Sequence, residues 1–220
     1  MKIDKIKDHT GDKLLLVFAG WSASPALFRH LEGPGEGTDL WICYDYRDLT
    51  FEEDLSGYRE IDLIAWSLGV WAASVALKGR EAAINRAIAV NGTLCPVHDR
   101  WGIPEAIFRG TLDNVTEEGM RRFNRRMYGK REIQQACETA DARPLDEIRN
   151  ELQQLYLAIR KDEPAQVFSP LYNRALLSSA DRIFPAENLR AFWQGRLPVT
   201  EVDAPHYPFH LWSHWDEIWK

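Results

Sequence analysis

Ser67 is the residue of this chain whose neighbours indicate the clearest chemistry. It stands in Ala65–Gly69 (A-W-S-L-G), after an apolar run and before an alanine-rich segment with helical spacing, Leu68–Lys78. A sharp strand-to-helix turn would lift the serine hydroxyl clear of a sheet, and small residues two places before and after it prevent collisions. The amide N–H of Leu68 would then point toward an oxyanion. The pattern predicts a nucleophilic serine; the alternative is an ordinary helix-capping serine.

A nucleophilic serine needs a general base, and His206 is the candidate among six histidines. It follows a short apolar run, Val199–Val202, and a turn. Asp181 follows the run Arg174–Ser178 and completes the chain order serine, acid, histidine. Its carboxylate would hold the imidazole in one tautomer and stabilise the protonated form. Asp203 is a competing acid, three residues before His206 at the end of the same predicted strand.

A second oxyanion donor is expected in the loop after the earlier run Leu14–Phe18. Gly20 allows a close backbone turn there, and the N–H of Trp21 falls where serine hydrolases place this donor. The indole of Trp21 would also form a wall of the acyl pocket. The alternative is a glycine-containing loop anchored by a tryptophan.

Neither a metal site nor a disulfide is predicted. His210 and His214 are four residues apart on a predicted terminal helix, Leu211–Trp219, but no acidic residue lies between them. A pair of that spacing can bind metal, yet we expect surface or helix-capping roles. No CxxC or Cys/His cluster occurs. We expect buried, reduced thiols at all three cysteines: Cys43, Cys95 and Cys137.

The elements that position these residues form an α/β pattern, with helix-length segments between apolar runs. Six such runs predict buried, parallel strands: Lys13–Phe18, Leu40–Tyr44, Ile61–Trp66, Arg86–Asn91, Arg174–Ser178 and Val199–Val202. No strand candidate occurs from about Cys95 to Asn173. Three segments there have helical character: Thr116–Tyr128, Lys130–Thr139 and Leu145–Arg160. We expect residues 95–173 to form a helical lid inserted in a single domain, 1–220.

Composition narrows the function classes. Hydrophobic residues make up 45% of the 220 residues and charged residues 27%, which suffices for a globular core. The net charge of −6 argues against a dedicated nucleic-acid binder. The charged N-terminus lacks the apolar run of a signal peptide, and no stretch approaches the ~18 apolar residues of a membrane span. We therefore expect a soluble, cytoplasmic monomer.

Together, four motifs resemble those of one α/β-hydrolase family, the pimeloyl-acyl-carrier-protein methyl ester esterases of biotin synthesis. They are Phe18–Trp21 (F-A-G-W), Ala65–Gly69, Asp181–Pro185 (D-R-I-F-P) and Pro205–Phe209 (P-H-Y-P-F). The resemblance is closest to the BioG type, with the BioH type more distant, and it covers essentially the whole chain. It implies an α/β-hydrolase fold, no metal or organic cofactor, and hydrolysis of the methyl ester of pimeloyl-acyl carrier protein.

The resemblance also implies roles for individual residues. Three match the family's triad: Ser67, Asp181 and His206. Arg122–Met127 resembles the lid helix that lines the acyl channel in the BioH type, with Phe123 in the aromatic position. The residues expected to contact substrate are Trp21, Leu68, Phe123 and Met127.

Met120–Arg131 carries a local excess of positive charge in an acidic protein. Acyl carrier proteins are acidic, and a basic helix near the pocket mouth would attract and orient one. The arginines expected to do so are Arg121, Arg122, Arg125 and Arg126. The alternative is a solvated helix face whose charges pair with the lid's own acids.

A triad reports a type of reaction and not a substrate. A general short-chain carboxylesterase or a thioesterase with the same triad therefore stays open. So does a serine-dependent acyltransferase, which would pass the acyl group to an alcohol or amine. A non-catalytic binding protein is disfavoured, because serine, acid and base candidates occur in the expected order.

Overall fold

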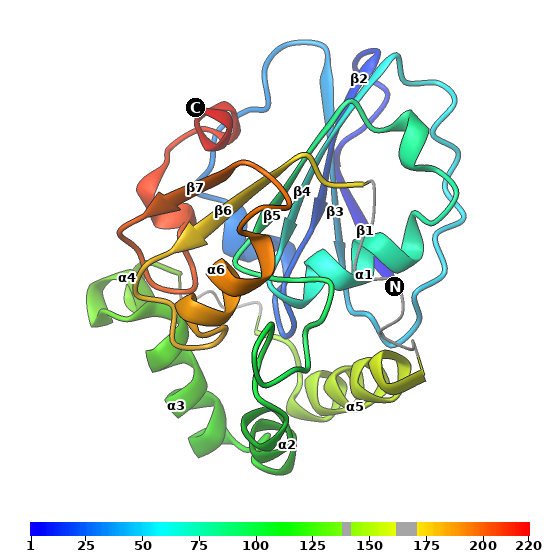
Figure 1. The fold of residues 1–220 in the computed structure, drawn as a ribbon. Helices are drawn as coiled ribbons and strands as arrows, with labels where there is room; N and C mark the ends of the chain where they lie inside the picture. Colours follow the sequence, from blue (N-terminus) through cyan, green and yellow to red (C-terminus); the bar gives the residue numbers. More distant parts are fainter. Residues whose placement is uncertain (138–141, 162–170) are drawn as a thin grey trace.

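The computed structural model describes residues 1–137, 142–161 and 171–220. These residues form a seven-stranded sheet in the order β1-β3-β2-β4-β5-β6-β7, shown in Figure 1. All neighbouring pairs are parallel except β1 with β3. The strands are β1 Lys2–Lys7, β2 Lys13–Phe18, β3 Thr38–Tyr44, β4 Glu60–Trp66, β5 Arg86–Val90, β6 Arg174–Ser178 and β7 Val199–Val202.

The six predicted strands are confirmed, with ends that move by at most two residues. The central ones are continuous apolar runs because helices cover both sides of them, and residues 14–18 of β2 are fully buried. Strand β1 was not predicted. This strand lies at the edge of the sheet, where it pairs with β3 only, and its side chains are largely exposed. Its sequence, K-I-D-K-I-K, therefore carries little of the apolar pattern that identifies the other strands.

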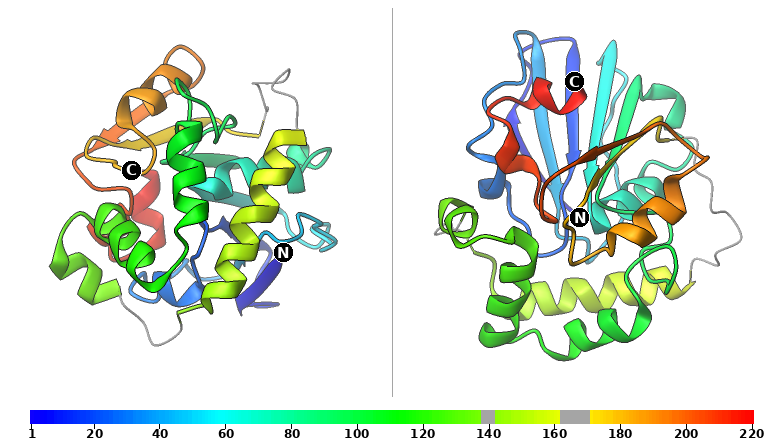
Figure 2. Two further views of the ribbon diagram at one scale, coloured as in Figure 1. Left: turned by 90° about the horizontal axis from the view of Figure 1, so that it is seen from below. Right: turned by 60° about the vertical axis from the view of Figure 1, so that its left-hand side comes forward.

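Two helices pack on one face of the sheet, α1 Leu68–Ala76 and α6 Ala186–Trp193, and the C-terminal segment lies on the opposite face (Figure 2). The prediction of a helix over Leu211–Trp219 is wrong. The chain there forms two short 3₁₀ turns, Phe209–Leu211 and Trp215–Trp219. Between them, the backbone of Ser213 and Trp215 pairs with Glu32 across the molecule, which withdraws those groups from helical bonding.

A helical insertion separates β5 from β6, as predicted, and lies at the carboxyl ends of the strands (Figure 1). It contains α2 Glu105–Asp113, α3 Glu117–Tyr128, α4 Arg131–Cys137 and α5 Leu145–Lys161. Helix α2 was not predicted, and Thr139, the expected end of α4, lies outside the described residues. Thr116 caps α3 by accepting a hydrogen bond from the Gly119 N–H. No described helix is long and apolar enough to cross a membrane.

Candidate active site

Ser67 occupies a sharp turn between β4 and α1, and its backbone angles are φ 60° and ψ −129°. This left-handed conformation is uncommon for a residue with a side chain and marks a locally strained turn. Two glycines are required next to this turn, Gly69 within it and Gly92 after β5. A Cβ on Gly69 would lie 2.4 Å from the carbonyl oxygens of Phe18 and Ala19, and one on Gly92 would lie 2.2 Å from the Ser67 carbonyl oxygen. The sequence spacing around Ser67 thus reflects close backbone packing.

The three residues predicted as a triad form one hydrogen-bonded line. The Ser67 Oγ lies 2.9 Å from His206 Nε2, and His206 Nδ1 lies 2.7 Å from an Asp181 carboxylate oxygen. An ionised carboxylate only accepts, so Nδ1 carries the proton and Nε2 is left to accept from the serine hydroxyl. All three residues are buried, with exposed fractions of 6% for Ser67, 1% for His206 and 7% for Asp181. The imidazole is thereby poised to take the serine proton.

Asp181 and His206 are both held from behind. The second Asp181 oxygen accepts hydrogen bonds from the N–H groups of Ile183 and Phe184, which fixes the carboxylate plane. The His206 carbonyl oxygen accepts from the side chains of Trp66 and Asn91, both at 2.9 Å. Asn91 also bonds both the N–H and the hydroxyl of Ser178 in β6. The loops after β5, β6 and β7 are therefore tied together beneath the imidazole.

The N–H groups of Trp21 and Leu68 are the predicted oxyanion donors, and neither donates a hydrogen bond to another described residue. Leu68 is the first residue of α1, where backbone N–H groups have no partner within the helix. Trp21 follows β2, the strand next to β4. The chain leaves β2 and β4 toward opposite edges of the sheet, and such a point is where ligands bind in open α/β sheets.

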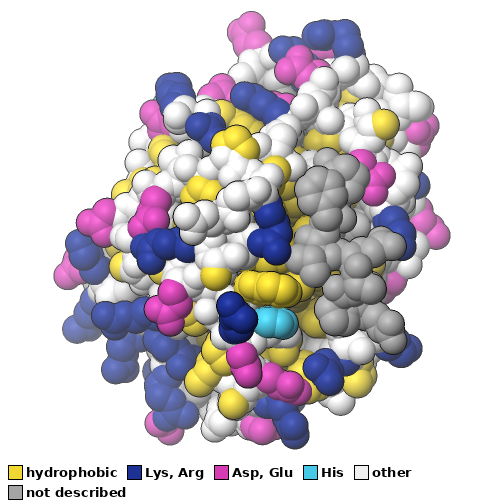
Figure 3. Space-filling model, viewed as in Figure 1, with side chains coloured by type: hydrophobic (Ala, Val, Ile, Leu, Met, Phe, Trp, Pro, Cys, Tyr) yellow, Lys and Arg dark blue, Asp and Glu magenta, His cyan; other side chains and the backbone are white. Residues whose placement is uncertain are grey.

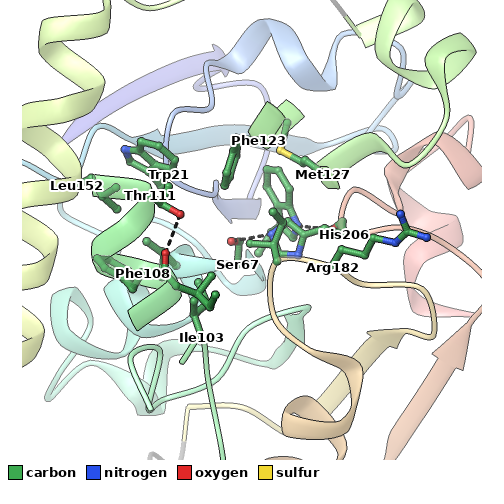
Figure 4. Close-up of a pocket in the computed structure, with 14 residues that line it drawn as sticks. Trp21, Ser67, Ile103, Phe108, Thr111, Phe123, Met127, Leu152, Arg182 and His206 are labelled. Atoms are coloured by element: carbon green, nitrogen blue, oxygen red, sulfur yellow. Dashed lines mark hydrogen bonds between the residues drawn. The ribbon is translucent and has the colours of Figure 1, made fainter. Parts of the chain in front are cut away.

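The cavity above Ser67 is small and apolar (Figure 4). Its volume is about 30 Å³. Predicted Phe123 and Met127 line it from α3, and the Phe123 ring packs edge-on against Trp21 at 5.0 Å. Sequence reasoning missed the other lining residues, several of them on α2: Trp66, Ile103, Ile107, Phe108, Thr111, Leu152, Arg182 and Ile183.

The remaining predicted residues lie away from this line. Asp203 is exposed and bonds only the Ser179 hydroxyl among the described residues, at 3.3 Å. No group of His, Cys, Asp and Glu side chains in the described chain is arranged to hold a metal ion. Arg182, which was not predicted, lies at the edge of the cavity, where its guanidinium points away from Ser67 (Figure 4).

The predicted basic residues lie on the outer face of α3. Figure 3 shows Lys and Arg side chains gathered at lower left, where Figure 1 places α3 and α4. Arg122 pairs with Glu118 one turn earlier on the same helix. The other three arginines are exposed and pair with no acid among the described residues: Arg121, Arg125 and Arg126. The patch is therefore only partly neutralised.

Three comparisons with known proteins bear on this site. A crystal structure of BioG from Haemophilus influenzae is 42% identical, with a TM-score of 0.92 and complete coverage of both chains. Malonyl-[acyl-carrier protein] O-methyltransferase from Bacteroides fragilis is 41% identical over 199 residues, which are 88% of this chain but only 39% of that protein. A lipase-esterase related protein from Clostridium acetobutylicum shares the fold at 13% identity and a TM-score of 0.64, with 96% and 93% of the two chains covered.

The family model described as pimeloyl-ACP methyl esterase BioG matches residues 1–218. That span includes the turn at Ser67, the helical insertion and the loop that carries His206. The fold is that of the α/β-hydrolases, as the sequence predicted. The chain therefore belongs to the BioG family of pimeloyl-ACP methyl esterases.

Proposed function

We propose that this protein hydrolyses the methyl ester of pimeloyl-acyl carrier protein, with Ser67, His206 and Asp181 as its catalytic triad. The observation that carries the proposal is the hydrogen-bonded line from Ser67 through His206 to Asp181, in a chain matched by the BioG model over residues 1–218. The partial match to a protein named as a malonyl-[acyl-carrier protein] O-methyltransferase adds support. The name of that protein implies that its product is a methyl ester of a carrier-bound acyl group.

The geometry suggests how the reaction proceeds. Ser67 Oγ attacks the ester carbonyl carbon while His206 Nε2 takes its proton, and the carbonyl oxygen becomes an anion that accepts from the Trp21 and Leu68 N–H groups. Collapse breaks the bond to methoxide, which receives the proton from His206 and leaves as methanol. Water then attacks the acyl-serine with His206 again as base. The products are the free carboxylic acid and an unchanged serine.

The alcohol part of this substrate is only a methyl group, which suits a site with little free space above Ser67. The longer acyl arm needs more room than the cavity of about 30 Å³ supplies. Its walls from α2, α3 and α5 all belong to the helical insertion, and a larger cavity of about 200 Å³ shares Trp21, Trp66 and Met127 with it. The acyl arm is therefore proposed to lie between the insertion and the carboxyl ends of the strands. Covering the acyl arm in this way is the role expected of a lid.

The exposed arginines of α3 are proposed to attract the acidic carrier protein. They stand on the same helix as Phe123 and Met127, which line the cavity from the opposite side of that helix. A carrier docked on the basic face would therefore bring its acyl arm close to the cavity wall.

The test is to incubate the purified protein with pimeloyl-acyl carrier protein methyl ester and to measure methanol and the mass of the carrier product. We expect the free acid, and none with Ser67→Ala. Unchanged activity of Ser67→Ala would refute the nucleophile, and a new ester or amide in the presence of an added alcohol or amine would show acyl transfer instead.

A second measurement tests the carrier surface. Arg125→Glu should lower kcat/KM for the carrier-bound ester but not for a free monomethyl ester, and the loss should shrink as salt rises. Lys78→Glu, an exposed lysine just beyond α1, makes the same charge change and should leave both activities unchanged. Equal loss on both substrates with Arg125→Glu would mean that the cavity, not carrier docking, was damaged.

A further inference from the structure

Glu151 is a fully buried carboxylate on α5, and it is not among the residues that line the cavity above Ser67. Burying a carboxylate costs free energy unless charged groups and hydrogen-bond donors surround it. Burial raises the pKa of Glu151, and the Arg143 guanidinium, 2.6 Å away, opposes that shift. An apolar residue would pack at this buried position without this cost.

Its other partners are two backbone N–H groups, one of Ser22 in the loop that carries Trp21 and one of Tyr46, just after β3. One Glu151 oxygen accepts from the Tyr46 N–H at 2.9 Å, and the other lies 3.4 Å from the Ser22 N–H. Ser22 directly follows Trp21 and has φ 65°. A residue with a side chain keeps this conformation only where its surroundings hold it.

The loop is held at two further points, one by Tyr46, which follows β3, and one directly by α5. Tyr46, whose backbone N–H donates to Glu151, also donates from its hydroxyl to the carbonyl oxygen of Ala19, at 2.8 Å. Ala19 lies two residues before Trp21. The Trp21 indole N–H donates to the carbonyl oxygen of Ile148, one turn before Glu151 on α5, at 2.7 Å. The Ser22 N–H and the Trp21 side chain are thus held directly by α5, and the Ala19 carbonyl is held by Tyr46, whose own N–H donates to Glu151.

The two proposed oxyanion donors differ in how their N–H groups are held in place. The Leu68 N–H is fixed by β4, α1 and the glycine contacts around Ser67. The Trp21 N–H belongs to a loop outside any helix or strand. We infer that Glu151 is a positioning residue, which holds the Trp21 N–H in the direction that an oxyanion requires. The inference rests on the oxyanion role given to Trp21 in the proposed function.

The test compares Glu151→Gln and Glu151→Leu with the unmodified protein on p-nitrophenyl acetate. Turnover is expressed per active site titrated by the initial burst. Losing one oxyanion donor costs about 10²–10³-fold in kcat, so we expect about a 10²-fold loss for Leu. Gln keeps one acceptor oxygen, and we expect a loss nearer tenfold. KM should change little, and the affinity for a trifluoromethyl ketone should fall in step with kcat/KM.

Glu147→Gln is the matched control. Glu147 lies one turn earlier on α5 and contacts Arg47, Lys2 and Arg143, but neither Ser22 nor Tyr46. It should leave turnover per titrated site unchanged. Should Glu151→Leu not fold, Glu151→Gln, which keeps the size of the side chain and one acceptor oxygen, carries the test.

Fewer titratable sites with normal turnover per site in the Glu151 variants would overturn the inference, because the residue would then serve only folding. An equal loss with Glu147→Gln would overturn it as well. An unmodified protein that hydrolyses no ester would refute the proposed function, and the inference with it; a hydrolysing protein that is insensitive to Glu151 would refute the inference alone.

Discussion

Replacing Asp181 by asparagine should abolish most of the hydrolysis while leaving the fold intact. One Asp181 oxygen accepts from the N–H groups of Ile183 and Phe184, at 2.8 and 3.0 Å. The asparagine side-chain oxygen should take this place. A flipped amide would instead point its NH₂ group, itself a donor, at the two buried N–H groups. The amide nitrogen then replaces the oxygen that now faces His206, and it donates where the carboxylate accepted.

The consequence is a change of tautomer. A donor opposite His206 Nδ1 forces that nitrogen to accept, so the proton moves to Nε2, which can no longer take the proton of Ser67. Serine hydrolases with this substitution lose about 10⁴ in kcat, which corresponds to about 5.5 kcal/mol of transition-state stabilisation. The contacts of 2.7 and 2.9 Å place Asp181, His206 and Ser67 in the arrangement on which this tautomer argument depends.

The assay is steady-state hydrolysis of p-nitrophenyl butyrate by Asp181→Asn, together with its melting temperature. Asp203→Asn is the matched control, because Asp203 is an exposed acid near His206 in sequence that bonds only Ser179 among the described residues. Surface substitutions usually change stability by less than about 0.5 kcal/mol, so we expect Asp203→Asn to fold normally and to retain its activity. If Asp181→Asn retained a tenth of the activity, or if Asp203→Asn lost more, the assignment of the acid would be refuted.

Three further outcomes are expected. Gly69→Ala should lower kcat by up to about 10²-fold, because its Cβ would push the turn away from β2; unchanged kinetics would contradict the close packing. Asn91→Ala should cost about 1–3 kcal/mol in urea unfolding by stranding buried partners, and should also slow hydrolysis, since Asn91 supports His206. Burial disfavours the Asp45 carboxylate, but hydrogen bonds from Arg47 and Lys2 and the charge of Arg143 outweigh it and lower its pKa to about 2. The ionised Asp45 therefore contributes on the order of 2 kcal/mol to the free energy of unfolding. This contribution is complete above the unfolded pKa near 4 and is lost as pH falls through about 2. Asp45→Asn should therefore reduce the change of the urea unfolding midpoint with pH over that range.

The sequence predicted the parts of this molecule that depend on local pattern. Buried parallel strands show as apolar runs, and the turn at Ser67 shows as small residues at fixed spacing, because both features arise from neighbours in the chain. Asp181 was preferred to Asp203 because it follows a predicted strand and a short turn, and His206 because it follows the last predicted strand; the structure brings both into one hydrogen-bonded line with Ser67. Their catalytic roles stay a prediction.

The rest depends on partners far away in sequence. Glu151 is one acid among several on an amphipathic helix, and its partners Tyr46 and Ser22 lie 105 and 129 residues away. The terminal segment has helical spacing, yet pairing with Glu32 prevents a continuous helix. Helix α2 was missed as well, although it supplies much of the cavity wall.

The position of the insertion in the chain has a consequence for how such enzymes can diversify. Ser67 and Trp21 precede the insertion and Asp181 and His206 follow it, and all four stand on loops or turns at the ends of neighbouring strands of the sheet. Evolution can therefore exchange the segment between β5 and β6, and with it the preferred acyl group, without dismantling the hydrolytic centre. A replacement segment would also need a buried acceptor for the loop after β2. Without one, we expect the new specificity to be accompanied by a lower kcat.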